Sequence, residues 1–161
     1  MEMTDDNKEF IFNSITQWLR DSNFIISEEK VTVVTSEFYA KAILTSDQEH
    51  ILEIVSSSGI ETRFMLRVRV HVSEQQLEMY ESLEPKEKLT LDDKTSSVIY
   101  PQGQSFVIKD IFALLEKIAS IEPKSIDAKH EFLQNVLNLF ESARRLEINF
   151  KEFFSNHTRK N

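Results

Sequence analysis

The spacing of apolar residues predicts amphipathic helices at both ends of the chain. One helix is predicted over residues 6–21, and two more over residues 106–120 and 125–146, with continuation of the last to residue 154 as an alternative. Pro123 separates the two C-terminal stripes, which is typical of a helix break. The stripe of the first helix consists of Ile11, Ile15, Trp18 and Leu19.

The middle of the chain alternates apolar and polar residues with the period of two that is typical of β-strands. Four such runs cover residues 24–36, 37–46, 50–58 and 63–73, and the first of them has a polar break at residues 27–30. Clusters of turn-forming residues separate the runs. Four strands joined by short turns predict an antiparallel meander with one buried face.

The segment between the last of these strands and the C-terminal helices has a weaker pattern. Ser73 and Gln76 fit a capping box, so a short helix is predicted to begin there and to end before Pro85. Residues 85–97 are polar and are predicted to form a loop, followed by a short strand at residues 98–100.

This order of elements predicts the α+β class, with an antiparallel β-meander sheet, an N-terminal helix and C-terminal helices packed on one face. The length of 161 residues fits a single domain over residues 1–161. Residues 155–161 are predicted to be a frayed tail.

The run "RFMLRVRVHVS" at residues 63–73 carries a basic stripe on the face opposite its apolar residues. Arg67, Arg69 and His71 are therefore candidate ligand-binding residues, because arginine suits carboxylate and phosphate recognition. Such a site defines one functional hypothesis, a small anionic-ligand binder or an enzyme.

The alternative for this stripe is a solvated face with cross-strand ion pairs. A hairpin loop at residues 58–60 puts Leu52 opposite Leu66 and Glu53 opposite Met65. The same register puts Glu49 opposite Arg69 and Asp47 opposite His71. It supplies an acid within reach of every basic residue of the stripe, without any ligand.

Aromatic residues gather at the end of the last predicted helix. Phe150, Phe153 and Phe154 can fold onto the sheet as core, or they can form an apolar patch that binds a partner or a second subunit. Both alternatives suit a protein that works by association.

Composition excludes several kinds of site. The chain has no cysteine, so disulfides, thiol nucleophiles and cysteine-ligated metals are excluded. With two glycines it has no glycine-rich phosphate loop, and the net charge of −8 argues against nucleic acid as a partner. The four histidines have no ligand spacing between them, so no metal and no cofactor is predicted.

No apolar run is long enough for a transmembrane helix, so no membrane association is predicted. The acidic N-terminus lacks the apolar segment of a signal peptide, and the predicted location is cytoplasmic.

The order of elements over residues 6–120 resembles the type III secretion chaperone-like fold, which is also found in YbjN-like proteins. The leading helix, the meander that ends in "RVRVHV" and the helix after Ser73 carry the resemblance. It implies a non-enzymatic role in binding proteins or peptides, often as a homodimer. The leading hypothesis is therefore a cytoplasmic, chaperone-like protein-binding module rather than an enzyme.

Overall fold

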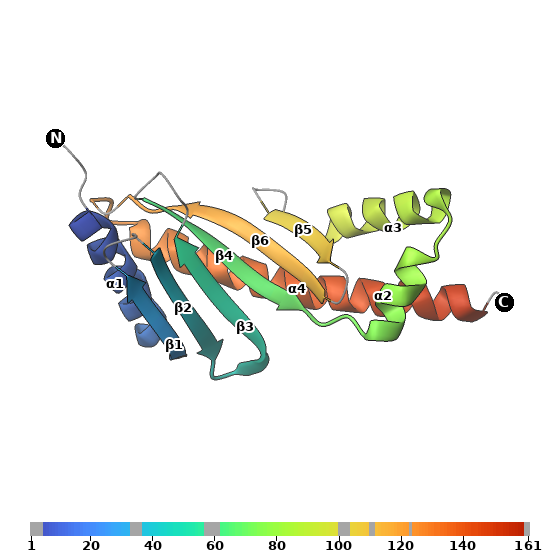
Figure 1. The fold of residues 1–161 in the computed structure, drawn as a ribbon, viewed down its shortest axis with the longest axis horizontal. Coiled ribbons are helices and arrows are strands. Elements are labelled where there is room, and N and C mark those ends of the chain that lie inside the picture. The colour runs from blue at the N-terminus through green and yellow to red at the C-terminus, as the bar shows by residue number, and fades with distance from the viewer. Residues whose placement is uncertain are drawn as a thin grey trace.

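The computed structural model describes residues 5–32, 37–56, 62–99, 104–109, 112–122 and 124–159. Helices and strands follow the order α1, β1 to β4, α2, α3, β5, β6 and α4 along the chain (Figure 1). The helices are α1 (Asp5–Asp21), α2 (Glu74–Glu81), α3 (Pro85–Val98) and α4 (Ala128–Arg159). The strands are β1 (Phe24–Thr32), β2 (Glu37–Leu44), β3 (Asp47–Ser56), β4 (Arg63–Val70), β5 (Gln104–Lys109) and β6 (Phe112–Ser120).

The six strands form one antiparallel sheet in the order β1-β2-β3-β4-β6-β5. The first four strands are the predicted meander, and the hairpin of β5 and β6 adds two more strands beside β4 (Figure 1). The predicted α+β class, with an antiparallel sheet and helices at both ends of the chain, is confirmed.

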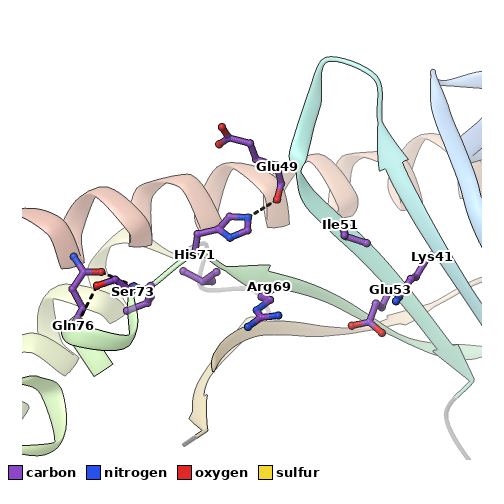
Figure 2. Close-up of a pocket in the computed structure, with 10 residues that line it drawn as sticks. Lys41, Glu49, Ile51, Glu53, Arg69, His71, Ser73 and Gln76 are labelled. Carbon is purple, nitrogen blue, oxygen red and sulfur yellow. Dashed lines mark hydrogen bonds between the residues drawn. The ribbon is translucent and has the colours of Figure 1, made fainter. Parts of the chain in front are cut away.

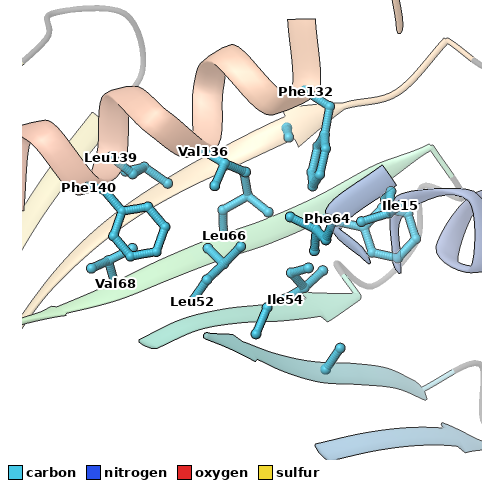
Figure 3. Packing of buried hydrophobic residues seen from close by; sticks show 14 of the residues in the cluster. Ile15, Leu52, Ile54, Phe64, Leu66, Val68, Phe132, Val136, Leu139 and Phe140 are labelled. Atoms are coloured by element: carbon cyan, nitrogen blue, oxygen red, sulfur yellow. The ribbon is translucent and has the colours of Figure 1, made fainter. Parts of the chain in front are cut away.

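Helices α1 and α4 pack on one face of the sheet, which we call the covered face. In Figure 1 both helices pass behind the strands, and α4 continues beyond the end of the sheet. The side chains that β4 contributes to this core are Phe64, Leu66, Val68 and Val70, all buried as their alternation predicts. Phe132, Val136, Leu139 and Phe140 of α4 lie against them (Figure 3).

The prediction of a helix over residues 106–120 is wrong, because this segment forms β5 and β6. Its apolar residues fit both the period of a helix and the period of a strand, and its alanine, leucine, glutamate and lysine residues favour a helix locally. The free edge of β4 decides for the strand: β6 pairs with it over eight residue pairs, from Arg63 with Ser120 to Val70 with Ala113. Hydrogen bonding along that edge outweighs the local preference.

The predicted loop at residues 85–97 is a helix, α3, and the predicted strand at residues 98–100 is not formed at Val98, where α3 ends. Residue 100 lies outside the described residues. Pro85 occupies the first turn of α3, where proline is favoured, and Glu84 and Glu87 form a capping box. The buried side chains of Leu91 and Thr95 give α3 a face toward the core. The polar composition of residues 85–97 therefore led to the prediction of a loop, whereas the segment is a short helix with one buried face.

Two boundaries of the outer elements also differ from the predictions. The polar break at residues 27–30 is an irregularity in the register of β1 between Ile26 and Glu28, and the strand continues through it. Helix α4 continues through residue 154, as one alternative predicted, and reaches Arg159, so residues 155–159 of the predicted tail are helical. The last two residues of that tail lie outside the described residues.

The aromatic cluster at the end of α4 belongs to the core. Phe150 and Phe154 are buried in a second hydrophobic cluster with Leu83 and Leu91, and Phe153 packs against it. Phe150 and Phe154 therefore follow the core alternative and form no exposed partner-binding patch, because α2 and α3 lie against this end of α4 and cover it, whereas Phe153 is half-buried.

Candidate functional site

The second face of the sheet carries no helix in the described part of the chain, and we call it the open face. Its central feature is a charged row of Lys41, Glu53, Arg67 and Glu116, which are direct neighbours on β2, β3, β4 and β6. Their signs alternate across the strands. Glu28 extends the row on β1, where it lies 3.8 Å from Lys41.

An apolar row runs beside the charged row, two residues away from it along each strand. It consists of Tyr39, Val55, Met65 and Ile118, which are again direct cross-strand neighbours. Ile118 is 51% exposed although its neighbours Val55 and Met65 are half-buried. The Tyr39 hydroxyl donates a 2.5 Å hydrogen bond to Glu53, which links the two rows. Burial and this hydrogen bond raise the pKa of Tyr39 well above its usual value.

The predicted register of β3 and β4 is wrong by two residues. Leu52 lies opposite Val68, and Glu53 lies opposite Arg67. Because the shift is even, every side chain keeps its predicted face, whereas its partner changes. Arg67 also forms a 3.1 Å ion pair with Glu116 of β6, a strand that was predicted to be helical. The prediction of a face with cross-strand ion pairs is confirmed for Arg67, with a different set of acids.

Arg69 and His71 line a concavity of about 600 Å³ at the end of the open face (Figure 2). Lys41, Glu49 and Glu53 line it as well, so its wall carries both signs of charge. Arg67 is not part of this wall. The structure therefore brings two of the three predicted ligand-binding residues together and separates the third.

A network of polar side chains lies at the same end of the sheet, on the covered side. His50 of β3 is 2% exposed, and both of its ring nitrogens face a carboxylate. Nδ1 lies 3.0 Å from each carboxylate oxygen of Asp47, and Nε2 lies 2.7 Å from Glu147 of α4. Arg144, one turn before Glu147, donates two hydrogen bonds of 3.1 and 2.9 Å to Asp47.

His71 completes this network from the end of β4. Its backbone N–H donates a 2.9 Å hydrogen bond to Glu147, and its ring nitrogen Nε2 contacts the backbone carbonyl of Glu49 (Figure 2). The ring centroids of His50 and His71 are 5.1 Å apart. One carboxylate of α4 therefore joins the ends of two strands.

The network shifts the pKa values of its members. The hydrogen bond with Glu147 raises the pKa of His50, burial opposes this effect, and Asp47 adds to it. Burial works to raise the pKa of Asp47, but its hydrogen bonds with His50 and Arg144 outweigh burial and lower it. The charged forms of His50 and Asp47 thus stabilise each other.

Sequence reasoning missed this constellation. His50 and His71 are 21 positions apart, and Glu147 is 76 positions beyond His71, so no motif spacing connects them. The histidines have no ligand spacing along the chain, yet the fold brings the rings of His50 and His71 together. The one available signal was the position of His50 on the apolar side of a strand, where a polar residue needs partners.

Comparison with known proteins gives one fold likeness. An uncharacterized protein from Methanothermobacter thermautotrophicus, known from its crystal structure, has a similar fold. The TM-score is 0.66 at 14% sequence identity, and the match covers 88% of this chain and 97% of that one. No protein-family model matches the sequence, and the search of curated proteins finds no match. At this identity the likeness concerns the fold alone, and the resemblance to type III secretion chaperones stays a prediction.

Among the described residues, no helix combines the length and the apolar character that a bilayer crossing needs.

Proposed function

We propose that the protein is a non-enzymatic protein-association module that binds through the open face of its sheet, and that the partner is a second copy of the same chain. The observation that carries the proposal is the alternation of charge along the row Lys41, Glu53, Arg67 and Glu116. The chaperone-like role and the cytoplasmic location stay predictions.

The charged row is complementary to itself. Consider a second copy placed face to face across a two-fold axis that is parallel to the strands and midway between β3 and β4. Glu53 then faces Arg67 of the second copy, and Lys41 faces Glu116 of the second copy. All four residues meet the opposite charge, which is what a two-fold symmetric interface requires of one surface patch.

The same axis brings the apolar row onto itself. Val55 then faces Met65 of the second copy, and Tyr39 faces Ile118 of the second copy. This contact covers the half-exposed Ile118 and adds apolar burial. Two sheets related in this way have aligned strands, which is a common geometry for sheets packed face to face.

The open face is large enough for a stable contact. Six strands, most of them eight to ten residues long, cover roughly 700 Å² at usual strand spacing, close to the roughly 800 Å² per partner of a standard interface. Desolvation of the charged row offsets much of its mutual attraction. We therefore expect the apolar row to supply most of the affinity and the charged row to set the register.

The mass of the purified chain in solution tests this proposal. We expect sedimentation equilibrium or light scattering to give twice the chain mass at micromolar concentrations. Ile118→Glu, which puts a charge into the apolar row at a half-exposed position, should convert the dimer into a monomer. Leu89→Glu, at an exposed position of α3, is the matched control and should stay dimeric. A wild-type chain that remains monomeric at about 100 µM, well above the dissociation constant expected of a standard-size interface, would falsify the proposal.

A small anionic ligand is the second candidate, because Arg69 and His71 share one concavity of about 600 Å³. This volume is in the usual range of ligand pockets. Lys41 adds a third basic group, whereas Glu49 and Glu53 oppose an anion. The mixed wall favours a ligand that has both an anionic group and hydrogen-bond donors.

Thermal unfolding with phosphate, citrate and nucleoside monophosphates tests this second candidate. A ligand that binds the native state raises the unfolding temperature, so at least one of these compounds should do so in wild type. Arg69→Ala should abolish the rise, and Arg63→Ala, on the same strand and outside the concavity, should keep it. The candidate is refuted by an unchanged unfolding temperature across the panel, or by a rise that survives Arg69→Ala.

A further inference from the structure

The geometry points to a divalent transition-metal site, of the class that binds Zn²⁺, formed by His50, His71 and Glu147. One nitrogen of each imidazole and one carboxylate oxygen of Glu147 all lie within 4.8 Å of one another. The three residues come from β3, the end of β4 and α4, so a cation here would connect the sheet to the long helix.

The distances are close to those of a metal centre. Ligand atoms around a tetrahedral Zn²⁺ are roughly 3.3 Å apart, given metal–ligand bonds of about 2.0–2.1 Å. His50 Nε2 and Glu147 are 2.7 Å apart, and the whole set spans at most 4.8 Å. Small side-chain rotations therefore suffice to bring all three ligands to bonding distance.

Both imidazoles are already oriented as metal ligands usually are. A metal-bound histidine almost always donates its second ring N–H to a carboxylate or a backbone carbonyl. His50 Nδ1 faces the Asp47 carboxylate, which leaves Nε2 as the ligand atom in the neutral ring. His71 Nε2 faces the carbonyl of Glu49, which can only accept, so in the neutral ring Nδ1 is the nitrogen with the free lone pair.

Asp47 is itself held in place. Arg144 donates two hydrogen bonds to it, at 3.1 and 2.9 Å. The chain Arg144–Asp47–His50 thus fixes the ring that is most deeply buried. Hydrogen bonds that hold a ligand side chain in place are a separate argument for a metal site. An ion pair between exposed surface side chains does not need such hydrogen bonds.

The donor set selects the class of cation. Two imidazoles and one carboxylate suit Zn²⁺ and its neighbours in the first transition row, whereas Mg²⁺ and Ca²⁺ prefer a shell of oxygen atoms. Three protein ligands leave a fourth position of a tetrahedral ion for water or a small ligand.

That fourth position is accessible. A concavity of about 540 Å³, lined by Asp47, His50, Arg144 and Glu147 among others, opens beside the cluster. His71 itself is exposed and also lines the concavity of the open face. A cation can therefore reach the three ligands without unfolding of the core.

Calorimetric titration of the full chain with ZnCl₂ tests this inference. We expect one Zn²⁺ per chain. Loss of an outer partner usually lowers metal affinity by about 10–100-fold, so His71→Ala and Glu147→Gln, which remove ligands, should each lower it by at least about tenfold. With Co²⁺ as the probe, the wild-type chain should show the visible absorption of a four-coordinate ion.

The controls separate this site from adventitious binding and from misfolding. His130→Ala removes an exposed histidine of α4 outside the cluster and should leave the affinity unchanged. His71 is exposed, so His71→Ala should keep the fold, which circular dichroism checks. The inference is overturned if Zn²⁺ does not bind at 1:1, if His71→Ala and Glu147→Gln bind as wild type does, or if Mg²⁺ binds equally well.

Discussion

A mixture of two charge-reversed variants, Glu53→Arg and Arg67→Glu, is expected to form dimers that neither variant forms alone. In the proposed dimer each Glu53 faces an Arg67 of the second copy, and the two-fold axis repeats this contact. In either variant alone, both contacts bring like charges together, which costs several kcal/mol. Since about 1.4 kcal/mol corresponds to a factor of ten, each variant should dimerise at least about a hundredfold more weakly than wild type.

The mixture restores both contacts. The arginine introduced into one variant faces the glutamate introduced into the other, and the unchanged Arg67 of the first faces the unchanged Glu53 of the second. Sedimentation velocity of each variant and of their equimolar mixture at one total concentration measures this effect.

The mixture also removes an ambiguity. Residues 53 and 67 are also cross-strand neighbours within one chain. Each variant chain therefore carries two like charges side by side, both alone and in the mixture. Recovery on mixing therefore reports the contact between chains and not the fold. Lys129→Glu, a charge reversal on α4, is the control and should dimerise as wild type does. If the mixture stays as monomeric as its components, this arrangement of the dimer is wrong.

Replacement of Phe140 by alanine is expected to lower the free energy of unfolding by about 3–5 kcal/mol. The side chain is fully buried and connects α4 to two strands. Its ring centroid lies 5.9 Å from that of Phe24 and 6.1 Å from that of His50. The substitution removes these contacts and leaves a cavity between α4 and the sheet.

Urea denaturation at a fixed protein concentration measures this loss, because dimerisation would otherwise change the apparent stability. Leu137→Ala is the matched control: it lies three residues earlier on the same helix and is 48% exposed. We expect it to change the free energy by no more than about 0.5 kcal/mol. Equal losses in the two variants would mean that α4 does not pack on the sheet through Phe140.

The sequence predicted the fold class because most of the elements have one clear period. The first helix and the strands around Ala40 and Val68 lie where their patterns place them. Residues 106–120 fit two periods, and only the unpaired edge of β4 decides between them. The segment after Glu84 failed for another reason: one face of α3 is buried only because the end of α4 lies beside it.

The candidate site was predictable to a smaller degree. Alternation placed Arg67 and Arg69 on one face, and this placement is correct. Their partners depend on the register, and the shift of two residues between β3 and β4 changes each partner while every side chain keeps its face. Glu116 could not be assigned to Arg67 at all, since its segment was predicted to be a helix that pairs with no strand.

The sequence by itself determined which side chains of "RFMLRVRVHVS" are buried and which lie on the other face, because alternation along a strand is a local property of the backbone. Only the tertiary structure decided which face α1 and α4 cover, and which residues from other parts of the chain lie beside that run. The charged row and the group of His50, His71 and Glu147 both arise in this way. Their neighbours lie up to 97 positions apart, and packing of the whole core, not any local pattern, sets those distances.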